Sequence, residues 1–299
     1  MKQQIKSSLI LLLTATIWGV AFVAQSVGME YIGPFTFNAI RCVLGGLVLI
    51  PVILVLKKKK ETGAENQEKE DKKTLWAGGI ACGVILCIAS NLQQFGIMEA
   101  SVGKSGFFTA LYIVMIPVIG IFIGKRPGIK LWFCVALAVV GKYLLCMKDG
   151  SFTIERADIM LLLCALAFSF HILVVDYFSP KVDGVKMSCI QFFVCGVLSA
   201  VGMLFTETPD ISNIQAAWLP LLYAGLLSCG VGYTLQIVGQ KGINPVIASL
   251  IMSLESVISA LAGWVILGQV LSPKEILGCV LMFVAIIITQ IPIGNKKTD

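Results

Sequence analysis

Long apolar runs separated by short polar stretches make up most of the chain. Ten runs can be counted, at about residues 5–27, 34–56, 75–98, 103–123, 129–147, 157–178, 185–205, 216–240, 246–267 and 274–292. Each is close to the roughly 20 residues that an α-helix needs to cross the hydrocarbon core of a bilayer. The pattern predicts an all-α integral membrane protein with ten transmembrane helices.

Composition and charge placement support this prediction. Hydrophobic residues form 57% of the 299 and charged residues only 13%, against about 25% charged in soluble domains. With the N-terminus placed in the cytoplasm, 17 of the 23 lysines and arginines fall in cytoplasmic segments, seven of them in the charged loop 57–74, and three in external loops. The bias predicts that both termini are cytoplasmic. The placement of the +6 net charge therefore orients the chain in a lipid bilayer, and we do not expect it to bind nucleic acid.

The first run and the cysteines fit the same class of protein. The first run follows lysines, as in a signal peptide, but it continues from Ile5 to Val27 without a small-x-small cleavage site, which indicates a retained helix. The ten cysteines form no C-x-x-C pair, and a single histidine cannot complete a Cys/His zinc set. We expect buried thiols, no metal and no cofactor.

The two halves of the chain repeat. At an offset of 150 residues, Leu11-Leu12-Leu13 fall on Leu161-Leu162-Leu163 and Arg41 falls on Gln191. Each half holds five predicted helices, and an odd number inverts the second half in the membrane. We predict two inverted repeats, residues 1–148 and 149–299, with a site near the bilayer midplane between them.

Two ionisable residues stand out inside the apolar runs. Glu255 lies near the middle of the run 246–267, where a carboxylate costs at least about 2.5 kcal/mol and must face protein or a water-filled cavity. His171, the single histidine, lies mid-membrane, and imidazole titrates near neutral pH, which suits proton coupling. A hydrogen-bonded packing role is the alternative for each.

Other polar and aromatic residues inside the runs are candidates to shape a cavity. Gln93 and Gln94 point about 100° apart on a helix and cannot both face one way, and we prefer Gln94, with Asn91 one turn below it. Arg41 is expected to snorkel or to form a structural or gating pair with a carboxylate, and Asp176 to cap its helix or pair with Lys181. The predicted substrate-binding set is Trp18, Asn91, Gln94, Tyr112, His171, Tyr233, Gln236 and Glu255, with Glu255, His171 and Arg41 as candidates for proton coupling or gating.

Several stretches are similar to a known family. They are IWGVAFVAQ (17–25), GPFTFNAIR (33–41), SNLQQFGI (90–97), GKSGFFTALYIVMIPVIGIFIGKRP (103–127), HILVVD (171–176) and SLESVISALAGWVILGQ (253–269). Over essentially its whole length the chain resembles the EamA-type carriers of the drug/metabolite transporter superfamily. The resemblance implies ten helices in two inverted EamA repeats and a central cavity lined mainly by helices 1, 3, 4, 6, 8 and 9.

The chain departs from the family pattern at two places. The usual Glu-Pro of the ninth helix is Glu255-Ser256 here, so we expect a straighter helix without a proline kink. The usual Gly-Glu after it is Gly268-Gln269, so a role for that second carboxylate does not carry over.

The expected function is secondary transport by alternating access in the plasma membrane. The resemblance implies a small-molecule metabolite as substrate, such as an amino acid or a related polar or amphipathic compound, and export as the direction. A membrane sensor or scaffold and a lipid-handling protein are the alternatives. An enzyme is not expected, because Gly103-Lys104-Ser105 lacks the earlier glycine and the strand of a P-loop. The G-x-x-x-G pairs Gly79/Gly83 and Gly120/Gly124 leave a homodimer open.

Overall fold

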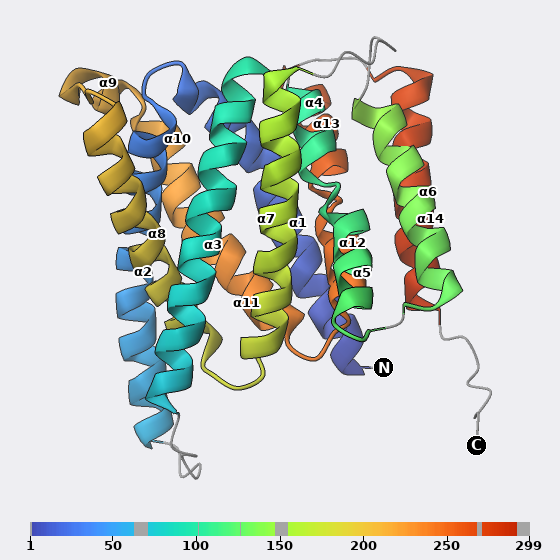
Figure 1. Cartoon of the computed structure of the whole chain (residues 1–299), viewed down its shortest axis with the longest axis horizontal. Coiled ribbons are helices and arrows are strands. Elements are labelled where there is room, and N and C mark those ends of the chain that lie inside the picture. Colours follow the sequence, from blue (N-terminus) through green and yellow to red (C-terminus); the bar gives the residue numbers. More distant parts are fainter. Residues whose placement is uncertain are drawn as a thin grey trace.

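A single bundle of helices forms the molecule (Figure 1). The computed structural model describes residues 2–62, 71–100, 102–125, 127–146, 155–267 and 271–291, and none of them lies in a β-strand. Each of the ten apolar runs falls in a helical segment. The elements are α1 (Lys2–Met29), α2 (Pro34–Thr62), α3 (Lys72–Glu99), α4 (Val102–Thr109), α5 (Tyr112–Phe122), α6 (Ile129–Cys146), α7 (Arg156–Phe178), α8 (Gly184–Thr206), α9 (Ile211–Ala216), α10 (Trp218–Leu222), η1 (Tyr223–Tyr233), α11 (Thr234–Gln240), α12 (Pro245–Met252), α13 (Glu255–Leu267) and α14 (Pro273–Gln290).

Seven helical stretches in the described part of the chain are long and apolar enough to cross a bilayer. They comprise α1, α2, α3, the α4–α5 stretch from Ser105, α7, α8 and the continuous stretch from α10 through α11. The structure therefore shows a multi-pass, all-helical membrane protein. A further apolar helical stretch, Pro245–Leu261, is shorter.

Two of the predicted helices are broken. α4 ends at Thr109 and α5 begins at Tyr112, while α12 ends at Met252 and α13 begins at Glu255. Both breaks tighten to hydrogen bonds between residues three apart: Leu111 N donates to Phe108 O and Leu254 N donates to Ile251 O, each at 3.1 Å. Such tight turns within a helical run are common at functional hinges.

The expectation of a straighter ninth helix is wrong. The Ser249 hydroxyl donates to the Val246 carbonyl and the Ser253 hydroxyl to the Leu250 carbonyl, both at 2.8 Å. Serine hydroxyls that bond back to the preceding turn compete with the helical ladder and bend it. The serine stripe therefore interrupts the helix even though no proline follows Glu255.

The eighth predicted helix is widened in its middle. η1 is an eleven-residue π-helix that continues from α10 into α11 and contains Gly225, Gly230 and Gly232. It packs closely on α1, since a Cβ at Gly232 would lie 2.7 Å from Trp18 Nε1. A wide turn releases backbone carbonyls from the regular ladder, and such turns are frequent at functional sites.

The helices pack in pairs that join the two halves of the chain. α2 packs along α8, α6 along α14, α3 along α7, and α1 along η1 and α11. The broken segments also pack across the two halves: α4 and α5 contact α7, and α12 and α13 contact α1. The Gly79/Gly83 pair lies on the α3–α8 contact, where Cβ atoms would meet Ile190 and Val194 at 2.5 to 2.6 Å. This G-x-x-x-G pair thus serves packing within the chain.

Candidate functional site

A cavity lies between the two halves and touches both broken segments. About 40 Å³ of it is accessible to the centre of a water molecule. That central space holds a few waters at most. The described residues that line it are Trp18, Phe22, Gln25, Arg41, Gln93, Thr109, Tyr112, Phe168, Ile172, Ser228, Tyr233, Gln236 and Glu255.

The lining comes from the segments that the resemblance implied. The first, third, fourth, sixth, eighth and ninth predicted helices each contribute at least one residue, and Arg41 adds the second. Of the predicted substrate-binding and gating residues, the structure brings together on this cavity Trp18, Arg41, Tyr112, Tyr233, Gln236 and Glu255. Asn91, Gln94 and His171 are not among the described residues that line it.

Glu255 occupies the first position of α13 and is only 5% exposed. A helix N-terminus carries partial positive charge, which favours a carboxylate there. The groups that act on this carboxyl are the Lys142 ammonium from α6 and the Tyr112 hydroxyl from the start of α5. The two helix breaks therefore place a carboxyl and a phenol next to each other on the cavity.

Arg41 reaches the same cavity from α2 and is 2% exposed. Its Nη1 donates to Gln25 Oε1 at 3.0 Å, and its guanidinium carbon lies 5.6 Å from the centroid of the Phe37 ring. The described chain offers Arg41 no carboxylate at ion-pair distance. An amide and an aromatic ring thus hold this side chain, in place of the carboxylate pair considered from the sequence.

An aromatic wall forms one side of the cavity. The Trp18 and Tyr233 rings lie 4.6 Å apart between centroids with an interplanar angle of 55°, a favourable tilted arrangement. Trp18 Nε1 donates to the Ser228 carbonyl of η1 at 3.4 Å, which supplies the partner that a tryptophan N–H needs at this depth. Phe22 and Phe168 extend the wall. An apolar group would be accommodated here.

The amides of α3 point to different places. Gln93 lines the cavity, whereas Gln94 is fully buried and its amide has no hydrogen-bond partner among the described residues. Asn91 accepts from Asn38 Nδ2 at 2.9 Å and donates to Ser199 Oγ at 3.0 Å, which ties α3 to α2 and α8. Helical phase separates Gln93 from Gln94, as predicted, but phase alone does not decide which of the two faces the cavity, and the choice of Gln94 is not the one seen in the structure.

His171 lies one layer behind the aromatic wall. It is fully buried, its Nε2 lies 3.1 Å from Gln191 Oε1, and its ring makes an edge contact with Tyr233 at 6.1 Å between centroids. The Gln191 amide in turn donates to the Ser188 hydroxyl, which lies 2.8 Å from the Thr234 hydroxyl. The histidine therefore belongs to a buried hydrogen-bond network that packs against Tyr233.

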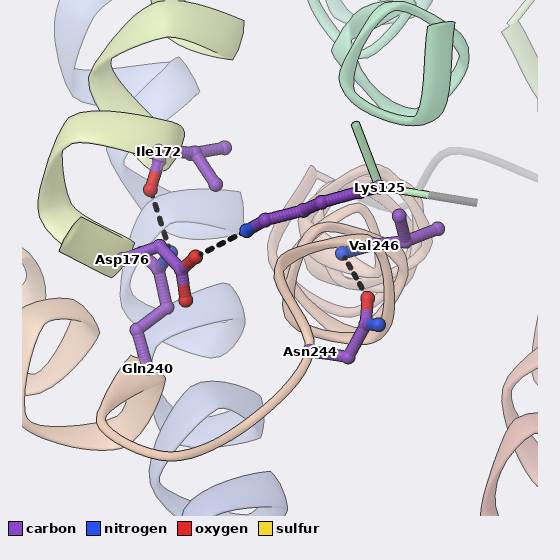
Figure 2. Close-up of polar contacts among 6 residues, drawn as sticks. All are labelled: Lys125, Ile172, Asp176, Gln240, Asn244 and Val246. Carbon is purple, nitrogen blue, oxygen red and sulfur yellow. Dashed lines mark hydrogen bonds and ion pairs between the residues drawn. The ribbon is translucent and has the colours of Figure 1, made fainter. Parts of the chain in front are cut away.

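Two contacts one turn apart join α7 to neighbouring segments, and we call them the α7 layer (Figure 2). Gln236 Nε2 donates to Gln240 Oε1 at 3.1 Å, and Gln240 Nε2 donates to the Ile172 carbonyl at 3.0 Å. One turn further, Lys125 Nζ forms an ion pair with Asp176 at 2.8 Å. Asp176 thus pairs with Lys125 and not with Lys181, which lies over the Tyr177 ring at 3.1 Å from its centroid.

A second cavity lies beside the α7 layer. Its volume is about 380 Å³, and its lining includes Ile116, Lys125, Leu173 and the start of α12 at Asn244. The Asn244 side chain caps α12 by accepting from Val246 N at 2.9 Å (Figure 2). The α7 layer therefore touches both cavities, since Ile172 lines the central one and Lys125 lines the second.

Seven lining residues were missed by the sequence analysis: Phe22, Gln25, Gln93, Thr109, Phe168, Ile172 and Ser228. A signal for two of them was present, because Trp18, Phe22 and Gln25 are spaced i, i+4 and i+7 and so share one face of α1. Thr109 lies at a helix break and Ser228 in the π-helix, which the apolar pattern does not reveal, whereas Gln93, Phe168 and Ile172 depend on which neighbour their helix faces.

Fold and site together define a multi-pass membrane protein with a polar and aromatic cavity inside its helix bundle. The chain belongs to the EamA-like transporter family, whose model matches residues 5–147 and again residues 155–291. The resemblance proposed from the sequence is thereby confirmed, and the general role of a transporter follows from the family.

Individual relatives agree with this assignment. The chain is 27% identical to an uncharacterized transporter of Archaeoglobus fulgidus over 94% of this chain and 84% of that protein. It is 24% identical to the uncharacterized transporter YwfM of Bacillus subtilis over 97% of this chain and 96% of that one. A solved crystal structure superposes with a TM-score of 0.77 at 17% identity, covering 95% of this chain and 96% of that chain, which shows a shared fold.

Proposed function

We propose that this protein is a secondary transporter of the plasma membrane that exports a small polar or amphipathic metabolite by alternating access. The observation that carries the proposal is the central cavity, where the two halves meet and where both broken helices place side chains, Tyr112 from one and Glu255 from the other. Transporters bind substrates between repeats near the midplane, often at discontinuous helices.

Two inverted repeats with ten transmembrane helices account for the packing pattern. If each helix is replaced by its counterpart in the other half, the α2–α8 contact and the α6–α14 contact are unchanged, because each joins a helix to its own counterpart. The α3–α7 contact becomes the contact of α1 with η1 and α11, which is also present. The two breaks, at residues 110–111 and 253–254, are 143 residues apart. Asn91-Leu92-Gln93 and Thr234-Leu235-Gln236 are separated by the same offset. The double match of the family model supports the same division of the chain.

The lower edge of the bundle in Figure 1 is the proposed cytoplasmic side. α1 begins and α14 ends at this edge (Figure 1). The positive-inside bias of the sequence supports this orientation. It places the α7 layer between the substrate cavity and the cytoplasm.

Alternating access requires contacts that close each end of the cavity in turn. The α7 layer closes the cytoplasmic end, and its ion pair is partly exposed, with 48% of the Lys125 side chain and 23% of the Asp176 side chain accessible. Exposed pairs contribute at most about 1 kcal/mol, so this contact can open at small cost. The narrow central space fits a state that is closed around few or no solute atoms.

An amino acid or a related compound suits the composition of the lining. The cavity offers a carboxyl in Glu255, a guanidinium in Arg41, amides in Gln25 and Gln93, and an aromatic wall. The proposed substrate class rests on the chemistry of these groups. A gradient or exchange would supply the energy.

The test compares metabolites inside cells and in spent medium for strains expressing wild type, Glu255→Gln, or no transporter. Wild type alone is expected to raise one compound outside and lower it inside. The membrane content of each variant is measured in parallel, so that loss of export is separated from loss of protein. If no compound shifts despite confirmed expression, export is wrong, and a sensor or lipid-handling role takes its place.

A further inference from the structure

Arg41 is a buried cation on the cavity that no carboxylate of the described chain balances. Of the five N–H donors of its guanidinium, Nη1 is used by Gln25, and Nε has no acceptor among the described residues. The ionisable groups that act on it are the thiols of Cys42, Cys195 and Cys229 and the phenol of Tyr233. Thiols and phenols are ordinarily uncharged at neutral pH. A buried charge without a counterion is costly.

Glu255 does not supply the missing charge. It lines the same cavity as Arg41, but the structure records no ion pair between these two described residues. The cation that acts on Glu255 is Lys142, which is itself only 1% exposed. Among the described residues Arg41 therefore has no carboxylate partner of its own.

The setting of Arg41 matches a planar anion. A guanidinium presents a rigid fork that binds a carboxylate through two parallel hydrogen bonds, which a lysine cannot reproduce. Gln25 holds one nitrogen, and the Phe37 ring lies against the guanidinium, so both restrict how the fork can rotate. Phe22 and Tyr233 line the cavity beside it. The site therefore suits a carboxylate attached to an apolar body.

Building on the proposed transport function, we propose that Arg41 binds the carboxylate of the transported solute and that the substrates are small carboxylates with an apolar body. The solute is then the counterion that the protein itself does not provide. A free α-amino acid qualifies, whereas its carboxamide, which keeps the ammonium group and the side chain, does not.

The test measures the thermal unfolding midpoint of the full chain in detergent with two matched pairs of probes. These are L-leucine against L-leucinamide and L-phenylalanine against L-phenylalaninamide, each titrated to about 10 mM. At least one acid is expected to raise the midpoint, and its amide should bind about 10- to 100-fold more weakly, because a charge-assisted pair of hydrogen bonds is lost. Equal stabilisation by acid and amide, or none by any probe, overturns the proposal.

Three variants connect the preference to this side chain. Arg41→Gln should abolish the preference for the acid, and Arg41→Lys should reduce it, since the charge stays and the fork is lost. Lys241→Gln, which removes an exposed positive charge away from the cavity, should keep the wild-type preference. A preference that survives in Arg41→Gln overturns the assignment. If that variant does not fold, the comparison of acid and amide on wild type still decides.

A transport measurement separates this proposal from the proposed function. If sealed vesicles carry a solute that has no carboxylate, the role of Arg41 is wrong and transport stands. If the acid preference holds but no probe acid crosses the bilayer, the Arg41 site stands and the protein binds its ligand without moving it.

Discussion

Thr36 and Glu207 lie 171 residues apart in the chain and are joined by a hydrogen bond of 2.6 Å from Thr36 Oγ1 to Glu207 Oε2. The same carboxylate accepts from the backbone N–H groups of Phe35 and Thr36, each at 2.9 Å. The residue after α8 thus caps the first turn of α2, where backbone donors have no partner within the helix. The cap connects the two halves at the end of the bundle opposite the α7 layer.

Replacement of Glu207 should destabilise the protein without altering the cavity. Glu207→Ala leaves the first-turn donors of α2 without their acceptor, and loss of a helix cap costs about 0.5–2 kcal/mol. Glu207→Gln keeps one acceptor oxygen and should cost less. Thermal unfolding in detergent measures both. Glu30→Ala removes an exposed carboxylate at the same end and is the control. An unchanged midpoint for Glu207→Ala would show that water replaces the cap.

The Lys125–Asp176 pair should control how often the cytoplasmic end opens. Asp176→Asn removes the ion pair, and Ile116→Cys, in the second cavity, reports access through labelling by a membrane-impermeant maleimide in a background without the native cysteines. Because the pair contributes at most about 1 kcal/mol, labelling should rise by up to about 5-fold.

The charge-reversed double variant is the control for this pair. Lys125→Asp together with Asp176→Lys restores opposite charges in exchanged places and should return labelling toward the wild-type rate, while either reversal alone should not. If Asp176→Asn labels at the wild-type rate, the ion pair does not contribute to closure.

Gly232 should be intolerant of even one added methyl group. Its Cβ would lie 2.7 Å from Trp18 Nε1, so Gly232→Ala has to displace the indole from the Ser228 carbonyl or shift η1 from α1. Overpacking of this kind costs about 1–3 kcal/mol, and the midpoint of thermal unfolding should fall. Gly106→Ala is the matched helical control, because its Cβ would find nothing nearer than 3.8 Å. Equal midpoints for the two variants would contradict the close contact.

Much of the fold could be predicted because lipid imposes a simple rule on the sequence. Every apolar run of sufficient length has to be helical in a bilayer, and each of the ten runs does lie in helix. The breaks before Tyr112 and Glu255 could not be predicted, because apolar residues continue through both of them. They follow from local competition for backbone carbonyls, as by Ser249 and Ser253, which hydrophobicity does not report.

The candidate site could be predicted where the position of a residue along its apolar run decides, and less well where the direction of its side chain around the helix matters. Glu255 and Trp18 lie on the cavity, as their depth in the apolar runs suggested. The choice of Gln94 over Gln93 required knowledge of which neighbour α3 faces, and the sequence does not contain it. His171 is buried as expected, but its ring contacts Tyr233 and does not line the cavity.

The two ionisable candidates for coupling should therefore differ in their effect on transport. Glu255 lies on the cavity at the start of α13, so Glu255→Gln removes a charge at the place where solute binds, and uptake or exchange in sealed vesicles should fall at least about 10-fold. His171→Gln should cost less, about 3-fold or below, because its ring lies behind Tyr233 and glutamine can still bond to Gln191. Both rates are normalised to the amount of folded protein in the vesicles. A larger loss for His171→Gln than for Glu255→Gln would move proton coupling from α13 to the network behind the aromatic wall.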